Sequence, residues 1–412
     1  MLKNYFKIAI AVLKRRKFFT FISLFGISFT LTILMVATAF LDKELSPSYP
    51  DLKRNRSLYI TNVTLESSKE HWINSSSASF YFLDRYVSKL KVPEKIGIFT
   101  YSNKINAYVN NKKLVIENKY TDATYWEIAE YVFLEGKPYT EQQVANAERV
   151  GVISEATKKK YFGDQKSVVG KYVEADNVNY RVIGVVKDMP RSIRNFYGDL
   201  YLPYTVSKGG YKDVGLMGGF GAILLAKSEA DIPKMKEEYY RMLAKVPTND
   251  KNMDRLYAHA DNTVEHLARS LAGNNENAGI GKLLTYGGLL ILLFLLLPTI
   301  NLVNINITRI MERSSEIGVR KAFGASSKTL VYQFVVENVI LTLLGGIIGV
   351  VLSVVSIYLF NQSNIIPNLN LSLNFTVLFF GFVICLFFGL LSGVYPAWRM
   401  SRLNVVSALK AQ

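Results

Sequence analysis

The chain has 412 residues, half of them hydrophobic, and a formal net charge of +16. The excess cations flank apolar segments, because residues 42–280 carry a net charge of +4 and the other 173 residues carry +12; this distribution is typical of a membrane protein and argues against a nucleic-acid groove. Cys385 is the only cysteine, which excludes an intrachain disulfide and argues against a metal site built on thiolates.

The beginning of the chain joins a basic segment to an uncharged one. Residues 1–17 carry six cations and no acid, which predicts a cytoplasmic amphipathic helix on the membrane surface; a simple basic flank is the alternative. Residues 18–41 carry no charge and are long enough to cross about 30 Å of hydrocarbon, so they predict the first span. A cleaved signal peptide is the alternative, since Ala37-Thr38-Ala39 has the form of a cleavage site, but this apolar run is longer than a usual signal core.

Residues 42–280 predict a large mixed α/β domain. Their apolar runs are short and are separated by Asn, Asp, Gly, Ser and Pro, and strand patterns alternate with helix patterns. We expect strands over 57–65, 96–109, 113–117, 150–154, 170–174, 180–186 and 220–226, and helices over 79–90, 155–162 and 232–243. The segment is long enough for one domain or for two lobes with boundaries near Thr121 and Tyr204. Residues 271–281 are rich in Asn and Gly and predict a flexible link back to the membrane.

Three further apolar segments predict three more spans. They cover 281–307, 329–360 and 375–398, separated by a charged loop or helix over 308–328 and a short outer loop over 361–374, with a tail over 399–412. Two glycine pairs in these spans have the small-xxx-small spacing of closely packed membrane helices: Gly345 with Gly349, and Gly389 with Gly393. The alternative is that glycine is simply common in membrane helices.

The cations predict the orientation of these spans. Six precede the first span, five lie in the loop 308–328, three lie in the tail, and the loop 361–374 has none. The positive-inside rule therefore places both termini and the loop 308–328 in the cytoplasm. The predicted fold is an α-helical membrane protein with four transmembrane helices and a large extracytoplasmic mixed α/β domain between the first and second spans.

The sequence offers no candidate catalytic or metal-binding residues. A phosphate-binding G-x-x-x-x-G-K-[ST] loop is absent, since Gly281-Lys282 is followed by Leu283, and H-E-x-x-H is absent too. The spans lack the chain of carboxylates that a proton-driven transporter usually has. Only Glu337 approaches a span, and we interpret it as an interfacial carboxylate at the cytoplasmic end.

The stretch 311–327, MERSSEIGVRKAFGASS, has a helical composition and mixed charge. Gly324 can take the left-handed conformation that ends a helix, and Ser326 and Ser327 can cap the next one. We therefore expect a short charged helix at the cytoplasmic surface, joined directly to two spans, where another protein could bind.

Several motifs resemble one family. Arg313 with EIGVRKAFGA (316–325), followed by QFVVENVILTLLGGIIG, resembles the FtsX/MacB permease family, also called type VII ABC transporters. The tail YPAWRMSRLNVVSALK (395–410) resembles the C-terminal motif of that family, with departures at Val405 and Ser407. WEIAEYVFLEGKPYT (126–140), VISEATKKKYFG (152–163), VVGKYV (168–173) and YRVIGVVKDMP (180–190) are similar to the MacB-like periplasmic core domain. Together these motifs cover nearly the whole chain in the order that the family has.

The resemblance implies a permease subunit in the inner membrane of a bacterium. It implies a dimer of permease subunits, identical or different, with a separate ABC ATPase that binds ATP and Mg²⁺, so no cofactor is expected on this chain. Hydrolysis would move the extracytoplasmic domains, a mechanism called mechanotransmission, for export or extraction of a substrate; a periplasmic adaptor is a further candidate partner. The ATPase-coupling residues would be Arg313, Glu316, Ile317, Gly318, Arg320, Phe323 and Gly324.

Alternatives remain open at this point. Glu316 and Arg320 have the spacing to pair with each other on the helix surface without any partner protein. An FtsX-like regulator of a cell-wall hydrolase and a lipoprotein-releasing permease of the LolC/LolE kind have the same membrane topology. A membrane-anchored enzyme is disfavoured because the sequence has no catalytic constellation.

Overall fold

The structure is a computed structural model, and it describes residues 10–11, 13–15, 17–70, 72–109, 112–248, 252–311, 319, 323, 326–363, 365–384, 386–387 and 390. The chain divides into two units. The helical unit comprises Met1–Glu44, Leu284–Ile365 and Asn370–Gln412. The large domain comprises Leu45–Leu283 and Ile366–Leu369. Each unit is described below by itself.

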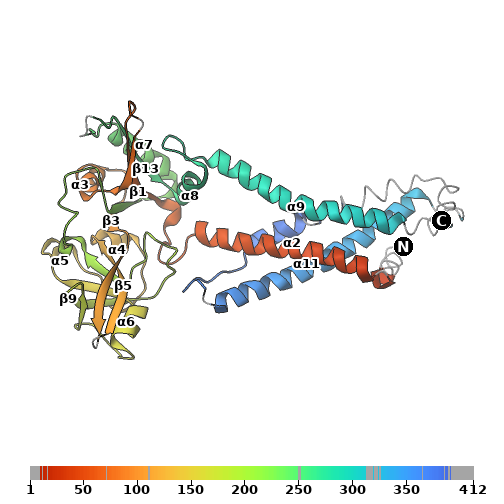
Figure 1. Ribbon diagram of the computed structural model, residues 1–412, viewed down its shortest axis with the longest axis horizontal. Coiled ribbons are helices and arrows are strands. Elements are labelled where there is room, and N and C mark those ends of the chain that lie inside the picture. Colours follow the sequence, from red (N-terminus) through yellow and green to blue (C-terminus); the bar gives the residue numbers. More distant parts are fainter. Residues whose placement is uncertain are drawn as a thin grey trace. The chain divides into compact units, whose positions relative to one another are not determined.

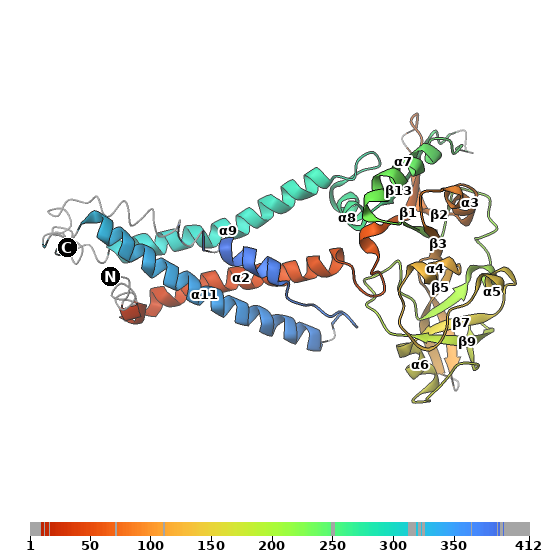
Figure 2. The ribbon, with the colours of Figure 1, turned by 180° about the vertical axis from the view of Figure 1, so that it is seen from behind.

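One part of the large domain is an antiparallel sheet covered by helices. Its strands follow the order β3-β12-β1-β2-β11, and β13 also pairs with β1. The elements are β1 (Ser57–Glu66), β2 (Ile73–Ala78), α3 (Phe80–Arg85), β3 (Lys95–Thr100), α4 (Thr124–Ile128), β11 (Met217–Gly218), β12 (Phe220–Leu225), α7 (Ile232–Leu243), β13 (Arg255–Asp261) and α8 (Thr263–Ala272). Figures 1 and 2 view the molecule from opposite sides, and both show α3, α7 and α8 close to β1 and β13.

Strand β1 is buried on both of its faces. Leu58 and Ile60 pack into one core with Phe82 of α3 and Tyr239 of α7. Tyr59 points the other way, into an aromatic core with Phe99, Tyr125 and Trp126. Successive side chains of a strand alternate between faces, so the apolar first half of β1 lies between two cores, whereas its second half also carries the polar residues Thr61, Asn62 and Thr64.

The other part of the large domain is a closed ring of six strands. Around the ring, β5 pairs with β10, β10 with β7, β7 with β9, β9 with β8, β8 with β4 and β4 with β5. The elements are β4 (Asn103–Val109), β5 (Lys112–Thr121), β6 (Phe133–Gly136), α5 (Glu141–Ala145), β7 (Val150–Ser154), α6 (Glu155–Phe162), β8 (Tyr172–Ala175), β9 (Val178–Val186) and β10 (Leu200–Pro203). A third core of Ala107, Ile116, Ile153, Val182 and Leu200 belongs to this ring.

Among the described residues, Phe99 of β3 and Thr121 of β5 are the one pair that joins the strands of the two parts into one hydrogen-bonded network. The two parts also share the aromatic core that contains Phe99. The strands of the ring lie between Thr100 and Tyr204 in the sequence. The division into two lobes near Thr121 and Tyr204 stays a prediction, since the whole large domain is one compact unit. Short 3₁₀ turns complete the domain at Arg54–Arg56, Val87–Lys89, Tyr204–Val206 and Glu229–Asp231.

The bounds of some predicted helices and strands differ from those in the structure. The predicted helix 79–90 is shorter: Ser79 caps α3 by accepting a hydrogen bond from the amide of Phe82 at 2.9 Å, and α3 ends at Arg85. The predicted strand 96–109 divides into β3 and β4 because the chain turns at Tyr101-Ser102 to reach the ring. The predicted helix 232–243 coincides with α7.

The helical unit contains long apolar helices. They are α2 (Lys17–Leu45), α9 (Ile280–Met311) and α11 (Ser327–Ser363). Within the described residues, two helices are long and apolar enough to cross a membrane, Lys17–Leu45 and Val331–Ser363, and two shorter apolar helices cover Ile280–Leu293 and Phe375–Ile384. The four-span count therefore stays a prediction. Helix α9 continues to Met311, four residues into the segment 308–328 that is predicted as a charged loop or helix, since no glycine or proline interrupts it there.

Candidate functional site

Most of the predicted ATPase-coupling residues, namely Arg313, Glu316, Ile317, Gly318, Arg320 and Gly324, lie outside the described residues. Phe323 is described and is 88% exposed, and its amide donates to the carbonyl of Val319 at 3.1 Å. Ser326 precedes α11 and its Oγ accepts a hydrogen bond from the amide of Thr329 at 3.2 Å, as the predicted cap requires. The coupling role of this segment stays a prediction.

The glycine pair Gly345 and Gly349 lies where α11 approaches α2 closely. A Cβ on Gly345 would come within 2.9 Å of Ile27, and one on Gly349 within 3.0 Å of the carbonyl oxygen of Ser28. The hydroxyl of Thr32 also donates to the carbonyl of Gly349 at 3.2 Å. Small residues allow this separation; that the protein requires them here stays a prediction. Gly389 and Gly393 lie outside the described residues.

Glu337 does not have the exposure of an interfacial carboxylate. It is fully buried on α11, where its Oε1 accepts a hydrogen bond from Nε2 of Gln333 at 3.1 Å. Asn338 and Thr342 are buried too, and each donates to a carbonyl of the same helix, at 3.0 Å to Phe334 and at 2.9 Å to Asn338. The burial of these side chains indicates that other protein groups cover this face of α11.

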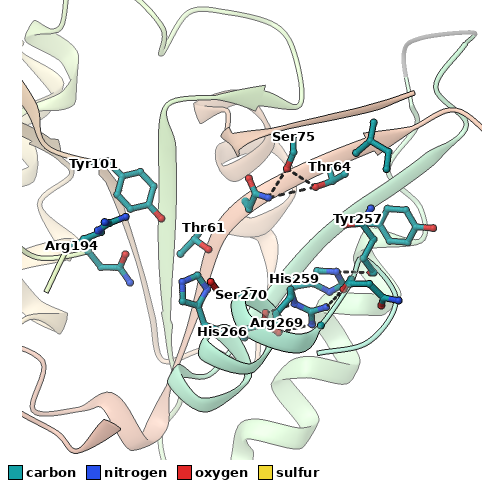
Figure 3. A pocket seen from close by; sticks show the side chains of 17 residues that line it. Thr61, Thr64, Ser75, Tyr101, Arg194, Tyr257, His259, His266, Arg269 and Ser270 are labelled. Carbon is teal, nitrogen blue, oxygen red and sulfur yellow. Dashed lines mark hydrogen bonds and ion pairs between the residues drawn. The ribbon is translucent and has the colours of Figure 1, made fainter. Parts of the chain in front are cut away.

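A polar cavity of about 700 Å³ opens in the large domain (Figure 3). Its walls come from β1, β2, β13, α8, the turn after α8, and the loop between β9 and β10. The residues that line it are Thr61, Asn62, Thr64, Ile73, Ser75, Tyr101, Arg194, Asn195, Tyr257, His259, Asp261, His266, Arg269, Ser270, Gly273, Asn274 and Asn275. Sequence reasoning identified none of them as functional. We call this cavity the polar pocket.

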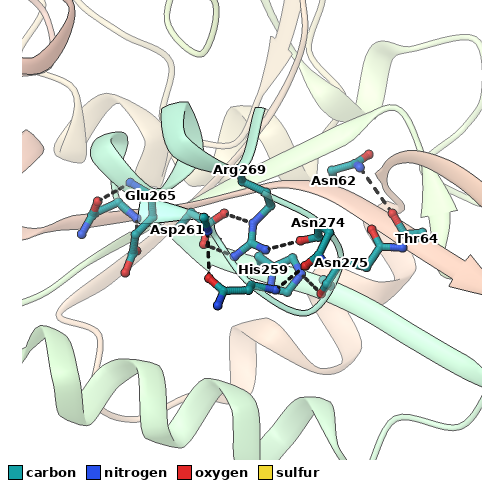
Figure 4. A network of polar contacts seen from close by, with 12 residues as sticks. Asn62, Thr64, His259, Asp261, Glu265, Arg269, Asn274 and Asn275 are labelled. Carbon is teal, nitrogen blue, oxygen red and sulfur yellow. Dashed lines mark hydrogen bonds and ion pairs between the residues drawn. The ribbon is translucent and has the colours of Figure 1, made fainter. Parts of the chain in front are cut away.

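Arg269 organises one wall of the polar pocket (Figure 4). Its guanidinium holds the buried carboxylate of Asp261 with two hydrogen bonds, and it also donates to the carbonyl of Asn274 at 2.8 Å. The side chain of Asn274 then accepts hydrogen bonds from the amides of Glu276 and Asn277. The segment 271–281 thus has a hydrogen-bonded turn in place of the predicted flexible link.

His259 fastens the same turn to β13. Its Nε2 donates to the carbonyl of Asn275 at 2.8 Å, and its Nδ1 lies 3.4 Å from the hydroxyl of Tyr240. Burial, with a smaller contribution from the charge of Arg269, lowers the pKa of His259. The imidazole is therefore neutral near pH 7 and can serve as a fixed structural donor.

The opposite wall is held from inside the domain by a buried lysine. Lys119 is fully buried, and its ammonium donates to the carbonyl of Thr100 at 2.6 Å and to that of Arg194 at 3.3 Å. It lies 5.0 Å from the ring centre of Phe99. Burial lowers the pKa of Lys119 to about 7. Tyr125 supports the same loop by donating to the carbonyl of Asn195 at 3.2 Å.

The chemistry of the polar pocket is that of binding. Hydroxyl, carboxamide, imidazole and guanidinium groups line it, and Asp261 is its only carboxylate. Within the described ranges of the chain, no three His, Cys, Asp or Glu side chains gather to hold a metal ion. The capping box formed by Asn262 and Glu265 is the sequence signal that would have located α8 and hence part of this wall.

Two family models match the chain. The MacB-like periplasmic core domain matches residues 20–239, and the FtsX-like permease C-terminal domain matches residues 288–405. The extracellular domain of the ABC-type transporter YknZ from Gram-positive bacteria has a TM-score of 0.36 and 16% identity, and covers 49% of this chain and 99% of its own. The periplasmic region of MacB from Actinobacillus actinomycetemcomitans has a TM-score of 0.37 and 17% identity, and covers 52% and 92%.

Curated relatives are transporter proteins of greater length. The pyoverdine export ATP-binding/permease protein PvdT of Pseudomonas syringae pv. syringae is 25% identical over 71% of this chain and 42% of its own. The macrolide export ATP-binding/permease protein MacB of Campylobacter jejuni is 27% identical over 67% and 41%, and the ABC transporter permease YknZ of Bacillus subtilis is 26% identical over 67% and 65%. The chain thus spans between about two fifths and two thirds of these relatives. Because the core-domain match alone covers more than half of its residues, the chain belongs to the family of FtsX-like ABC transporter permeases with a MacB-like periplasmic core domain.

Proposed function

We propose that this chain is the membrane subunit of a MacB-like ABC transporter and that a separate ATPase drives it. The sequence has no phosphate-binding loop for ATP. The distribution of cations supports four spans in a bacterial inner membrane, with both termini in the cytoplasm and residues 42–280 outside. Two copies, or this chain and a related one, would form the permease, with a periplasmic adaptor as a further partner.

The observation that carries this proposal is the continuity of α9. The helix begins at Ile280, directly after the hydrogen-bonded turn of the large domain, and runs without interruption to Met311. Its 32 residues are about 48 Å long, more than the roughly 30 Å of a hydrocarbon core. A single helix between the turn beside the polar pocket and the charged segment 312–326 supports mechanical coupling, because one element of secondary structure connects them without an intervening loop.

The way the segments are connected along the chain gives a route by which the movement of the ATPase would reach the large domain. The ATPase would bind the segment 312–326 and move it when ATP closes the ATPase dimer. Helix α9, at one end of this segment, would pass the movement to the large domain, and α11, at the other end, to the rest of the helical unit. The substrate would be released or extracted on the outer side, without passing between the spans.

The test is co-purification of the ATPase encoded beside this chain. Gly318→Trp should leave the protein inserted and the large domain folded but remove the ATPase, because a large side chain holds two backbones apart. Glu316→Arg should weaken association less, since an exposed ion pair contributes only about 0–1 kcal/mol. Gly287→Trp on α9 is the matched control, since a Cβ at Gly287 would meet no atom within 4 Å, and it should retain the ATPase.

Four results would contradict the proposal or part of it. Normal recovery of the ATPase with Gly318→Trp would remove the segment from the interface. Loss of a protease-resistant large domain in that variant would mean that Gly318 serves packing. Robust ATP hydrolysis by the purified chain alone would contradict the separate ATPase. A cell-wall hydrolase in the purified complex, in place of an adaptor, would favour the FtsX-like regulator.

A further inference from the structure

We propose that the polar pocket binds a small hydroxyl-rich ligand through an oxyanion, carried as a carboxylate or as a phosphate ester. Arg194 is the principal contact for the oxyanion, and His266 with the hydroxyls of Thr61, Tyr101 and Ser270 completes the site. This inference goes beyond the proposed transport function, because the binding step does not involve the ATPase.

The charges of the polar pocket favour an anion. Its charged lining residues are Arg194, Arg269 and Asp261, two cations against one carboxylate. Asp261 is already bound by Arg269 through two hydrogen bonds. In the part of the chain that the structure describes, no carboxylate lies within ion-pair distance of Arg194, so its guanidinium is available. A guanidinium presents parallel N–H groups that match the two oxygens of a carboxylate or phosphate.

Arg194 stands on a loop that is fixed before any ligand arrives. The ammonium of Lys119 donates a hydrogen bond to the backbone carbonyl of Arg194, and the hydroxyl of Tyr125 donates one to the backbone carbonyl of Asn195. The hydroxyl of Tyr131 donates to the next carbonyl, that of Phe196, at 2.6 Å. Three successive carbonyls are thus held by buried or half-buried donors. A preorganised loop loses less conformational entropy on binding, which raises affinity.

The rest of the lining suits a polar ligand with many hydroxyls. The cavity volume of about 700 Å³ lies within the range of about 300–1,000 Å³ that is usual for small-molecule sites. In Figure 3, His266 and Ser270 on α8 lie on the side of the pocket where Thr61, Tyr101 and Arg194 are found. Hydroxyl, carboxamide and imidazole groups both donate and accept hydrogen bonds. A sugar acid or a sugar phosphate has this combination of features.

A ligand in the polar pocket would also contact the start of the helical connection. Asn274 and Asn275 line the pocket, and they belong to the turn that leads into α9. Binding would therefore stabilise this turn. We expect the backbone amides of residues 273–279 to exchange with solvent more slowly when the ligand is bound.

Binding to the purified full chain tests the proposal. Glucuronate and glucose 1-phosphate are the probes, and glucose is the neutral control, measured by calorimetry in detergent at low salt without phosphate buffer. At least one anionic sugar should bind, and glucose should bind at least about 10-fold more weakly; the tighter of the two anions identifies the oxyanion. Arg194→Gln should weaken binding by about 10-fold to 100-fold, since hydrogen bonds to charged groups are strong. Arg149→Gln, at an exposed arginine outside the pocket, should leave binding unchanged.

Hydrogen exchange shows where the anion binds. In the wild-type chain, the bound anion should protect residues 192–196 and 266–275 from hydrogen exchange, and in Arg194→Gln that protection should be lost at the same probe concentration. Unchanged thermal unfolding of Arg194→Gln shows that the variant is folded. Equal binding of glucose, binding that Arg194→Gln leaves unaltered, or no binding of either anion with a Kd below about 1 mM would overturn the proposal.

Discussion

Arg269 and Asp261 form a two-point ion pair, with Nε to Oδ2 at 2.7 Å and Nη2 to Oδ1 at 3.0 Å. Asp261 ends β13 and is 4% exposed, and Arg269 lies on α8. The third hydrogen bond of the guanidinium reaches the carbonyl of Asn274. One side chain thus joins a strand, a helix and the turn that precedes α9.

Removing this arginine should destabilise the large domain strongly. Arg269→Met leaves the Asp261 carboxylate buried without its partner, and we expect the free energy of unfolding to fall by about 3 kcal/mol. Urea unfolding followed by the fluorescence of buried Trp126, in a background with Trp72 and Trp398 replaced by Phe, measures it. The double variant with Asp261→Asn should recover part of the loss, because the buried charge is gone. Equal stability of wild type and Arg269→Met would contradict this role.

Lys119 should make the stability of the large domain depend on pH. Burial lowers the pKa of Lys119 to about 7, whereas an exposed lysine titrates near about 10.4. Between these values the unfolded chain binds more protons than the folded chain, so the free energy of unfolding rises with pH. Lys119→Met should reduce this slope by up to about 1.4 kcal/mol per pH unit. Urea unfolding at several pH values tests it; exposed Lys113→Met is the control, and parallel slopes for Lys119→Met and wild type would refute the prediction.

Gly26 on α2 and Gly345 on α11 form a matched pair for substitution, because one has open space beside it and the other has a close neighbour. A Cβ on Gly345 would meet Ile27 at 2.9 Å, whereas one on Gly26 would meet nothing within 4 Å. Alanine favours a helix over glycine by about 1 kcal/mol at either position, but at Gly345 the clash should outweigh it by about 1–3 kcal/mol. We expect Gly345→Ala to lower the thermal unfolding midpoint in detergent and Gly26→Ala to keep or raise it. The same shift in both variants would show that close packing at Gly345 is unimportant.

Single-cysteine labelling tests the orientation of the chain. In a Cys385→Ser background, cysteines at Lys160 and Asn368 should react with an impermeant reagent in intact cells. A cysteine at Ala325 should react only after the membrane is opened, since the cations of the loop 308–328 predict a cytoplasmic position. A cysteine at Lys160 that stays unlabelled in intact cells would refute this orientation.

The sequence predicts those elements whose local signals agree with their contacts. Helix α7 begins with a proline in its first turn and places Met235 and Tyr239 one turn apart on the buried side, so its pattern and its packing coincide. Strand β13 was missed because its buried residues include Ala258 and Ala260, whose small side chains give a weak apolar signal beside the polar residues that alternate with them.

The polar pocket could not have been predicted by local patterns. Arg194 stands in an irregular loop, and its position depends on Lys119, a charged residue that any hydrophobicity rule places at the surface. His266 reaches the same cavity from α8, far along the chain. These side chains meet around one space through pairings between strands that are distant in sequence, namely β13 with β1, β1 with β12, β12 with β3, and β3 with β5.

The closed ring of strands has a consequence for aggregation. A strand at the edge of an open sheet exposes unpaired amide and carbonyl groups that another molecule can pair with, but each of the six ring strands has a neighbour on both sides. The domain contains no cysteine, so no disulfide protects it while it folds. Closure therefore confines open edges to strands outside the ring. Among the described strands, β13 has seven residues and pairs with β1 alone, so one of its edges is open. The edge at β11 has only two residues and offers an intermolecular strand little to extend.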